Sequence, residues 1–299
     1  MSISAIKRNT VSQIIINIFF ILLSVSFITP LFAIISISLT SERDVVNYGY
    51  SLIPPNIDFS AYKFILSSPS TILSAYKVTA ITSFIGVLSS LLISSMCAFS
   101  LSRKDFKYRR QLTFYFFFTM LFNGGLVPYY ILMTKYLSLR NTYLALILPL
   151  IGNIWHMLIL RTFFQSLMVE IIESATIDGA SDVLIYAYIA LPLSTPALAT
   201  IGLFQLLSFW NSWYPALLFI TKKSLYPLQY LLQSMLRNAQ EIIRNMEQMS
   251  FIAPEELKNV PTESTRMAMC IIAIGPILFI FPFFQKYFVK GLTIGAVKG

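Results

Sequence analysis

Residues 11–39 read VSQIIINIFFILLSVSFITPLFAIISISL, a run without a charged side chain. About 20 apolar residues suffice to cross a bilayer as a helix, so this run predicts a membrane span. Lys7 and Arg8 precede it, as basic residues precede a secretory signal. However, the run is too long for the apolar core of a signal peptide, and no small-x-small cleavage site follows closely. We therefore expect a retained first span, over residues 12–38.

The rest of the chain continues this apolar pattern. Further apolar stretches lie at 76–102, 111–134, 142–165, 193–220 and 265–285. Of the 299 residues, 56% are hydrophobic and 12% are charged, whereas soluble domains carry about 25% charge. The sequence therefore predicts an all-α, polytopic membrane protein with six transmembrane helices in the cell membrane. We expect the net charge of +9 to meet the anionic inner leaflet rather than nucleic acid.

The short loop after the second span predicts the orientation. Residues 103–110 read RKDFKYRR and hold five basic side chains, and such loops stay in the cytoplasm. When this loop is included, the 22 Lys and Arg of the chain are divided evenly between the two predicted sides, so the orientation depends on the charge density of this short loop. Both termini should then be cytoplasmic, with 39–75 and 221–264 outside. The second outer segment is polar enough to predict a solvated lid.

The loop at 166–192 should lie inside, yet it is acidic, with Glu170, Glu173, Asp178 and Asp182. One apolar stripe at helical spacing comprises Leu167, Met168, Ile171, Ile172 and Ala175. Gly179 stands where a glycine ends a helix, and Ser181 can cap a second helix that Pro192 ends. The pattern predicts an amphipathic helix–turn–helix. Docking to a cytoplasmic partner is favoured over a helix on the lipid surface, because surface helices are usually basic.

The same loop resembles that of the permease subunits of binding-protein-dependent ABC importers. These carry E-A-A, three residues, G, nine residues and then I-x-L-P. The matching residues here are Glu173, Ser174, Ala175, Gly179, Ile189, Leu191 and Pro192, with Ser in place of the middle Ala. The segment with Asp178, Gly179 and Ala180 is similar to the carbohydrate branch, as are residues 209–213 (FWNSW) and 291–299 (GLTIGAVKG). The resemblance covers roughly residues 76–299 and is most similar to permeases for oligosaccharides.

The resemblance implies a heterodimeric pore with a second, homologous permease. Two ATPase subunits would bind ATP and Mg²⁺ at the inner face, and an extracytoplasmic solute-binding protein would deliver the sugar. This chain would hold no cofactor. The loop residues above would dock in the ATPase groove. The implied parts are residues 1–75 (N-terminal cytoplasmic segment, first span and outer loop), 76–290 (core transmembrane domain) and 291–299 (cytoplasmic tail).

The sequence lacks the residues that several other protein functions would require. The chain has no G-x-x-x-x-G-K-[ST] phosphate loop. We therefore expect that this chain does not hydrolyse ATP and is not an enzyme. No Asp or Glu falls in a predicted span, which argues against a proton-coupled secondary transporter. His156 is the single histidine, and packing is the favoured interpretation of it. Cys97 and Cys270 lie in apolar stretches and predict buried thiols rather than a metal site or a disulfide. An importer for a non-sugar solute and a secondary transporter stay as alternatives.

Sugar recognition pairs aromatic faces with amide or hydroxyl groups. Tyr129, Tyr130, Asn211 and Trp213 lie in the third and fifth spans and are candidates to line a substrate path, with membrane packing as the alternative. Glycine and proline interrupt several spans, and such breaks survive in a membrane where helices pack or a cavity is lined. The outer basic residues Lys222, Lys223, Arg237 and Arg244 are compatible with an acidic oligosaccharide and equally with solvated charges.

Overall fold

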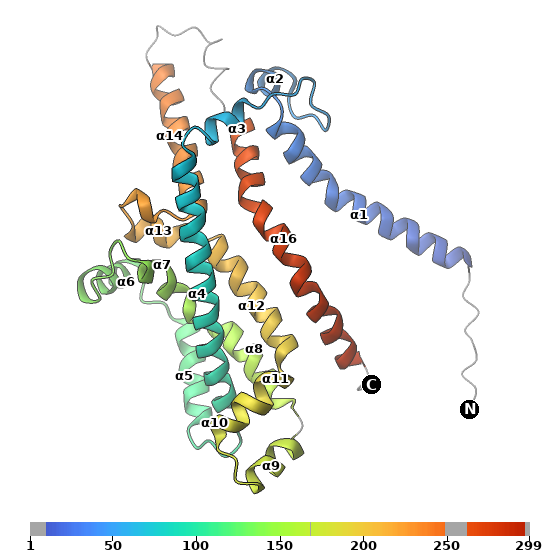
Figure 1. The fold of residues 1–299 in the computed structure, drawn as a ribbon, viewed down its shortest axis with the longest axis vertical. Helices are drawn as coiled ribbons and strands as arrows, with labels where there is room; N and C mark the ends of the chain where they lie inside the picture. The colour runs from blue at the N-terminus through green and yellow to red at the C-terminus, as the bar shows by residue number, and fades with distance from the viewer. Residues whose placement is uncertain (1–9, 168, 249–261, 297–299) are drawn as a thin grey trace. The chain divides into compact units, whose positions relative to one another are not determined.

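The computed structural model describes residues 10–167, 169–248 and 262–296, and every regular element in these ranges is helical (Figure 1). Some features of the sequence analysis lie outside the described residues. These are Lys7, Arg8, Met168, most of the second half of the predicted outer lid and the last three residues of the predicted tail. The elements are α1 Thr10–Ser38, α2 Glu42–Tyr48, α3 Ser60–Ile65, α4 Pro69–Ser102, α5 Arg109–Leu121, α6 Leu126–Ile131, the π-helix η1 Leu132–Tyr136, α7 Tyr143–Ile151, α8 Ile154–Gln165, α9 Val169–Ile177, α10 Asp182–Ile185, the π-helix η2 Tyr186–Ala190, α11 Leu191–Leu193, α12 Thr195–Trp210, α13 Tyr214–Phe219, the 3-10 helix η3 Lys223–Leu225, α14 Leu228–Gln248 and α16 Glu263–Ala296.

The described residues contain helices with the length and composition of membrane spans. Three are long and apolar enough to cross a bilayer, within α1, α4 and α16. Three bent pairs pass the same test together, α5 with α6–η1, α7 with α8, and α10–α11 with α12, with bends of 108°, 49° and 79°. The all-helical membrane fold is thus confirmed. The number six is reached if each bent pair is one span, and it stays a prediction.

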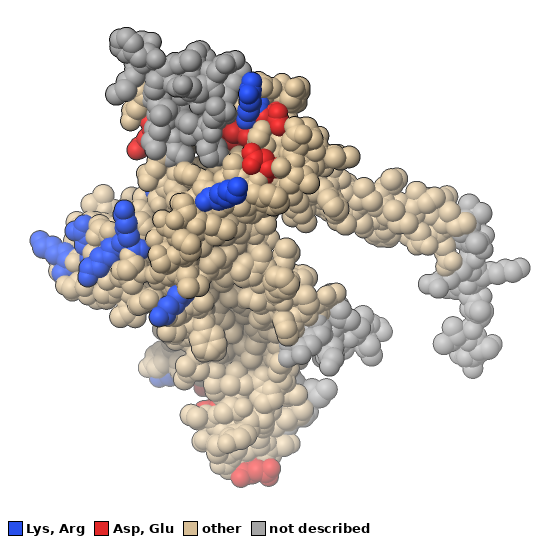
Figure 2. Space-filling view, turned by 45° about the horizontal axis from the view of Figure 1, so that its top comes forward, with Lys and Arg blue, Asp and Glu red and all other residues tan. Residues whose placement is uncertain are grey.

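Exposed apolar surface agrees with a bilayer environment. Phe27 of α1 and Phe84 of α4 are 72% and 68% exposed, and soluble proteins rarely expose large contiguous apolar patches. On the face drawn in Figure 2, charged side chains gather in small groups and broad uncharged areas separate them. Lipid tails can cover such areas without the cost that water would impose.

The chain divides into two compact units, residues 1–68 with 234–274, and residues 69–233 with 275–299. The first unit contains an anchor built on Glu42, which is 5% exposed. One carboxylate oxygen accepts hydrogen bonds from the Thr262 hydroxyl at 2.7 Å and the Glu263 N–H at 2.9 Å. The other accepts from the N–H and hydroxyl of Ser264, at 2.9 and 2.7 Å. Because the first N–H groups of a helix lack intrahelical partners, Glu42 completes the start of α16.

The second unit is built around α4, which packs against α7, α8 and α12. Small residues permit these close contacts: a Cβ at Gly86 would lie 2.4 Å from the ring of Phe209. The break between α7 and α8 is also held by α4, because the Ser90 hydroxyl donates to the carbonyl of Ile151 at 2.9 Å. Such hydrogen bonds satisfy backbone groups that a helix break frees in a membrane.

The start of the predicted outer lid differs from its expected solvated form. Residues 228–248 form helix α14, and Leu228, Leu231 and Leu232 near its start are buried. The N–H of Leu228 donates to the Thr79 hydroxyl of α4 at 2.8 Å. The composition of residues 221–264 predicted a polar loop, because Gln, Asn and charged residues outnumber the leucines in this segment. The leucines nevertheless recur at helical spacing and face the second unit's core.

Candidate functional site

The first half of the predicted acidic loop is a helix that ends in a closed turn. Helix α9 stops at Ile177, and the N–H of Gly179 donates to Thr176 O at 3.1 Å. The N–H of Ala180 reaches back to Ala175 O at 3.0 Å. These two bonds make a Schellman motif, which needs a residue with positive φ at its turn. Gly179 has φ +81°, a conformation that glycine adopts without the steric cost of a Cβ.

The second half begins at Ser181 and runs through Pro192. The Ser181 hydroxyl accepts the N–H of Leu184 at 3.4 Å, as an N-cap. The helix then widens into the π turn η2, where the N–H of Leu191 donates to Tyr186 O. Proline has no N–H and its ring crowds the carbonyl four residues earlier, and a π turn relieves this conflict. The helix ends at Leu193, directly after Pro192.

We call residues 169–193 the α9–α11 segment. Its apolar side packs against a cluster that includes Phe99 of α4 and Leu160 of α8. Ile172, Ala175, Ala180, Ile185 and Ile189 make these contacts. Ile171 of the predicted stripe is 40% exposed, whereas Ile172 of the same stripe packs against the cluster.

Polar contacts add to this packing. The hydroxyl oxygens of Ser95 and Tyr186 lie 2.7 Å apart, and the rings of Tyr186 and Phe99 lie 5.4 Å apart. Arg103, at the end of α4, pairs with Asp105 at 3.1 Å and with Asp182 of α10 at 3.4 Å. Both carboxylates are largely exposed, at 66% and 71%, so each pair contributes little stability. Through the same terminal nitrogen, Arg103 contacts both the loop after α4 and the first residue of α10.

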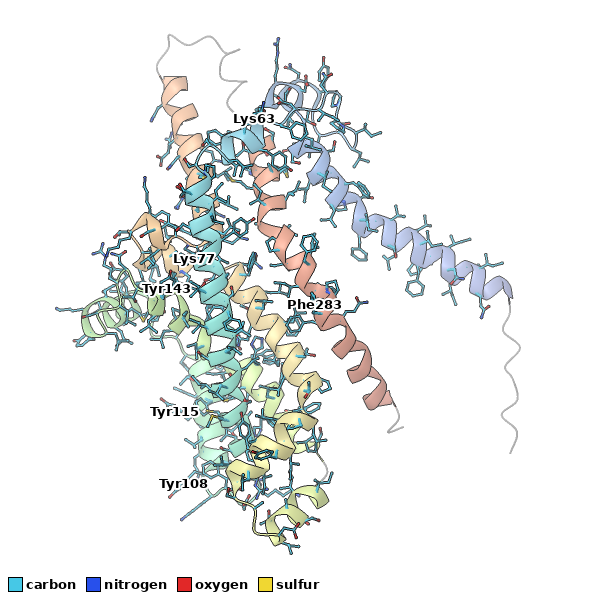
Figure 3. The ribbon with its side chains drawn as sticks, in the orientation of Figure 1. Lys63, Lys77, Tyr108, Tyr115, Tyr143 and Phe283 are labelled. Atoms are coloured by element: carbon cyan, nitrogen blue, oxygen red, sulfur yellow. The ribbon has the colours of Figure 1, made fainter. Side chains whose placement is uncertain are left out.

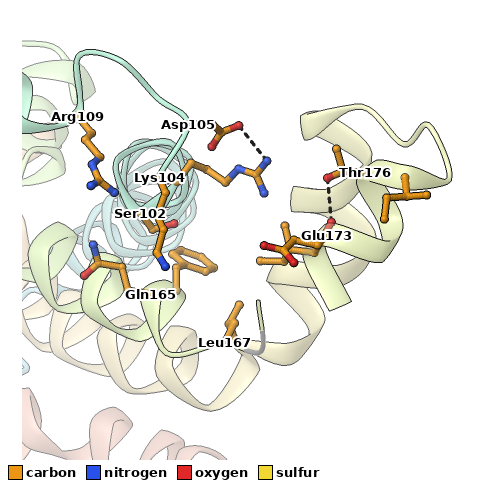
Figure 4. Close-up of a pocket in the computed structure, with 12 residues that line it drawn as sticks. Ser102, Lys104, Asp105, Arg109, Gln165, Leu167, Glu173 and Thr176 are labelled. Atoms are coloured by element: carbon orange, nitrogen blue, oxygen red, sulfur yellow. Dashed lines mark hydrogen bonds and ion pairs between the residues drawn. The ribbon is translucent and has the colours of Figure 1, made fainter. Parts of the chain in front are cut away.

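A cleft of about 550 Å³ separates α9 from the basic loop (Figure 4). Lys104, Asp105 and Arg109 line one side, and Glu173 and Thr176 line the other. Figure 4 shows Glu173 directed into this space and Lys104 across from it. The sequence interpretation used residues 103–110 only for orientation and missed the role of Arg103. No sequence signal connects Arg103 with Asp182, because the pairing is long-range.

The predicted loop residues divide between exposed and packed positions. The exposed ones are Glu173, Ser174, Asp178, Gly179 and Pro192. The partly buried ones are Ala175, Ala180, Ile189 and Leu191. The segment therefore shows polar and turn residues outward while small and apolar residues hold it against α4 and α8.

A second cavity, of about 310 Å³, brings together three of the four predicted path residues. Tyr129, Asn211 and Trp213 line it, with Ser208 and Ser212 as further polar groups. The Tyr129 hydroxyl is buried and has no hydrogen-bond partner among the described residues. The Asn211 amide oxygen accepts from Gln229 Nε2 at 3.2 Å, and its Nδ2 donates to Leu207 O at 2.9 Å.

Tyr130 and His156 do not line this cavity. The Tyr130 ring stacks on Phe219, with centroids 5.8 Å apart and 17° between the planes. His156 is buried, and its Nδ1 lies 2.8 Å from Gln205 Nε2. Its ring also stacks on Phe204. This environment agrees with packing as the role of His156. Cys97 and Cys270 are free and only partly buried, whereas the sequence predicted buried thiols.

The described residues form only helices as regular elements, and several of these helices are long and apolar enough to cross a bilayer, which defines an integral membrane protein. No family model matches the chain. It is 35% identical to the polygalacturonan/rhamnogalacturonan transport system permease protein YtcP of Bacillus subtilis (strain 168), over 98% of this chain and 100% of YtcP. It is 36% identical to protein LplC of the same strain, over 91% of this chain and 90% of LplC.

A solved structure supports the same relationship to sugar transport permeases. The crystal structure of a bacterial ABC transporter involved in the import of the acidic polysaccharide alginate matches with a TM-score of 0.75 and 27% identity, over 96% of this chain and 100% of the matched chain. The chain therefore belongs to the permease subunits of carbohydrate ABC importers. Such permeases work with a second permease, ATPases and a solute-binding protein, and the separate ATPases hydrolyse ATP. Membership of the ABC importer permeases decides against the secondary transporter.

Proposed function

We propose that this permease moves an acidic oligosaccharide into the cytoplasm and that its α9–α11 segment docks on an ATPase subunit. The closed turn at Gly179 is the main observation that supports the docking role. Two backbone hydrogen bonds and the Ser181 cap make this turn rigid. The turn also lies where the resemblance places the coupling element. A rigid, exposed turn can transmit a displacement that a flexible loop would absorb.

The surface of this segment supports a protein partner rather than lipid. Glu173 and Asp178 are exposed, and helix α9 has no basic residue in its last turn. An acidic surface is repelled by the anionic inner leaflet but complements a basic protein groove. Packing of Ala175 and Ala180 on the cluster around Leu160 would carry a push on the turn into α4 and α8.

The proposed orientation follows from this docking role. An ATPase binds in the cytoplasm, so residues 103–110 and the α9–α11 segment lie on that side, with both termini. Residues 39–75 and 221–264 then lie outside, where the solute-binding protein arrives. The proposed parts of the chain remain 1–75, 76–290 and 291–299. The two compact units of the structure have other boundaries, since residues 234–274 join the first unit.

The substrate class is supported by the relatives. YtcP is named for polygalacturonan and rhamnogalacturonan, and the matched crystal structure concerns alginate. Galacturonic acid residues, like the uronic acids of alginate, carry a carboxylate on each ring. The exposed Lys222 and Lys223 follow α13, whose residues line the cavity with Tyr129 and Asn211. We infer that the cavity, with the unpartnered Tyr129 hydroxyl, lies on the path of the sugar.

The test is to purify this chain with its partners from the native membrane and to measure ATP hydrolysis. The solute-binding protein is loaded with oligogalacturonides, with the same oligosaccharides after reduction of their carboxyl groups, or with neutral arabino-oligosaccharides. We expect strong stimulation only by the carboxylated form. Equal stimulation by the reduced form would reject the acidic substrate and leave the importer class intact. If no ATPase co-purifies under mild conditions, the docking role is wrong.

A further inference from the structure

Helices α5 and α8 border a third cavity, which shares Arg109 and Gln165 with the cleft beside α9. These helices contact one another, and between them lies a groove of about 650 Å³. Arg109, Arg110, Thr113, Phe114 and Phe117 of α5 line it, together with Leu158, Arg161, Thr162 and Gln165 of α8. Tyr108 and Tyr115, labelled in Figure 3, mark the start of α5 and its second turn. Neither the family resemblance nor the proposed transport role assigns anything to this groove.

The groove separates charge from apolar surface along its length. Arg109 and Arg110 begin α5, while Phe114 and Phe117 lie one to two turns further along. On α8 the order is reversed, because this helix reaches Leu158 before Arg161 and Gln165. The Nε of Arg161 donates to the carbonyl of Leu101 at 3.1 Å, close to the end of α4. The cationic end of the groove therefore lies beside the basic loop, and the aromatic end lies further along α5, away from that loop.

The cationic end has no matching acid. Three guanidinium groups line the groove, and none of the described residues that line it is Asp or Glu. Among the described side chains, the ion pairs at this end of the bundle involve Arg103 and not Arg109, Arg110 or Arg161. Three neighbouring cations repel one another unless an anion joins them. Planar guanidinium groups suit phosphate oxygens, which accept two parallel hydrogen bonds.

The apolar end fits a hydrocarbon chain. Phe114 and Phe117 are 66% and 42% exposed in a chain that crosses the membrane. The hydroxyls of Thr113 and Thr162 donate to carbonyls of their own helices, at 2.6 and 3.0 Å. They therefore leave little polar surface between the arginines and the aromatic rings. An occupant needs a phosphate at one end and an acyl chain at the other.

We propose that this groove binds an anionic phospholipid, with the headgroup phosphate on Arg109, Arg110 and Arg161 and an acyl chain along Phe114 and Phe117. Basic pockets between membrane helices bind such headgroups in general. The inference does not depend on which sugar is carried. It requires only that the chain lies in a bilayer.

The experiment uses the full chain, purified in mild detergent with its native partner subunits. The probe is phosphatidylglycerol with a photoreactive group near the start of one acyl chain, and cross-linked peptides are identified by mass spectrometry. We expect labelling of the peptides around Phe114 and Leu158. Unlabelled phosphatidylglycerol should compete, while phosphatidylcholine and a large excess of inorganic phosphate should not. This competition is measured on the unmodified chain, so it does not depend on a variant's folding.

Variants then test the arginines. Arg109→Gln with Arg110→Gln should reduce labelling by at least tenfold, since each basic residue near an anionic lipid contributes about 1 kcal/mol, or about fivefold. The matched control is Lys135→Gln with Arg140→Gln, which removes the same charge from exposed positions outside the groove. The control should label as the unmodified chain does.

Three results would overturn the proposal. Equal labelling by the phosphatidylcholine probe would show that the arginines do not select the headgroup. Displacement by inorganic phosphate would show a site for a soluble anion. Labelling that appears only after the ATPase subunits are stripped away would show that the groove is a protein interface.

Discussion

The anchor between Glu42 and the start of α16 allows one stability effect to be worked through. The carboxylate has two oxygens, and each accepts two hydrogen bonds at 2.7–2.9 Å. Glu42→Gln keeps the shape of the side chain but places an NH₂ group where one acceptor was. An NH₂ group beside the N–H of Ser264 puts two donors face to face, and one N–H of α16 loses its partner.

The cost follows from the number and kind of bonds lost. A hydrogen bond to a charged group contributes about 1.5–3 kcal/mol, and the four bonds here are not additive because they share one carboxylate. For Glu42→Gln we expect a loss of about 2 kcal/mol in the opening free energy of this helix end. For Glu42→Ala we expect about 3–5 kcal/mol, comparable to removing one partner of a buried ion pair.

Amide hydrogen exchange measures this effect at the residues concerned. Exchange of the Glu263 and Ser264 amides should be about 30-fold faster in Glu42→Gln, since 1.4 kcal/mol corresponds to a factor of ten. Asp44→Asn is the matched control, because it removes a charge from the same helix α2 without removing an acceptor from α16. Unchanged exchange in Glu42→Gln, or an equal increase in the control, would refute the anchor.

The same anchor predicts a dependence on pH. Burial alone would raise the pKa of Glu42, but the hydrogen bonds from Glu263, Ser264 and Thr262 outweigh it and hold the pKa below its ordinary 4.5. A group with a lowered folded pKa stabilises above its unfolded pKa, and this stability is lost as the pH falls through the folded value. Protection of the two amides, corrected for intrinsic exchange, should therefore be constant above pH 4.5 and decline below it. Glu42→Gln should show no such decline.

Three further predictions concern the proposed coupling and path residues. Gly179→Ala should reduce sugar-stimulated ATP hydrolysis severalfold with normal membrane insertion, because a Cβ at φ +81° costs about 1–2 kcal/mol in this turn; unchanged stimulation would remove the turn from the mechanism. Glu173→Lys should lower ATPase co-purification severalfold, whereas Ser174→Ala, its neighbour, should not. Trp213→Ala should raise the sugar concentration needed for half-maximal uptake several-fold without changing subunit assembly, and the reverse pattern would favour a packing role.

Local signals in the sequence predicted the local structure well. Gly179 and Ser181 were identified because a helix end and a helix start depend on residues within a single turn. The sequence also showed that glycine and proline interrupt several spans, and one such interruption precedes α6, where the Asn123 side chain accepts the Gly125 N–H at 2.8 Å. The membrane class followed from composition alone, because a bilayer demands long apolar helices.

Long-range pairings could not be predicted in this way. Glu42 appeared as one charge in an outer segment, yet its four donors lie more than 200 residues away along the chain. Arg103 was one of five basic residues in a loop, and nothing in its neighbours indicates Asp182 as its partner. Both roles depend on which helices become neighbours in the fold. A single sequence reports the apolar faces of helices but not their pairing.

Helix α4 connects the two candidate sites, and this connection gives the coupling proposal a physical route. Its length of 34 residues corresponds to about 51 Å. Near its end, Ser95, Phe99 and Arg103 contact the α9–α11 segment. Closer to its start, Val78 packs in the cluster that holds Phe219, a residue of the cavity with Tyr129. A displacement of the α9–α11 segment must therefore either move α4 or break its contacts with Tyr186. The coupling proposal therefore predicts that α4 moves with the segment and displaces Val78, which packs in the same cluster as Phe219 of the cavity.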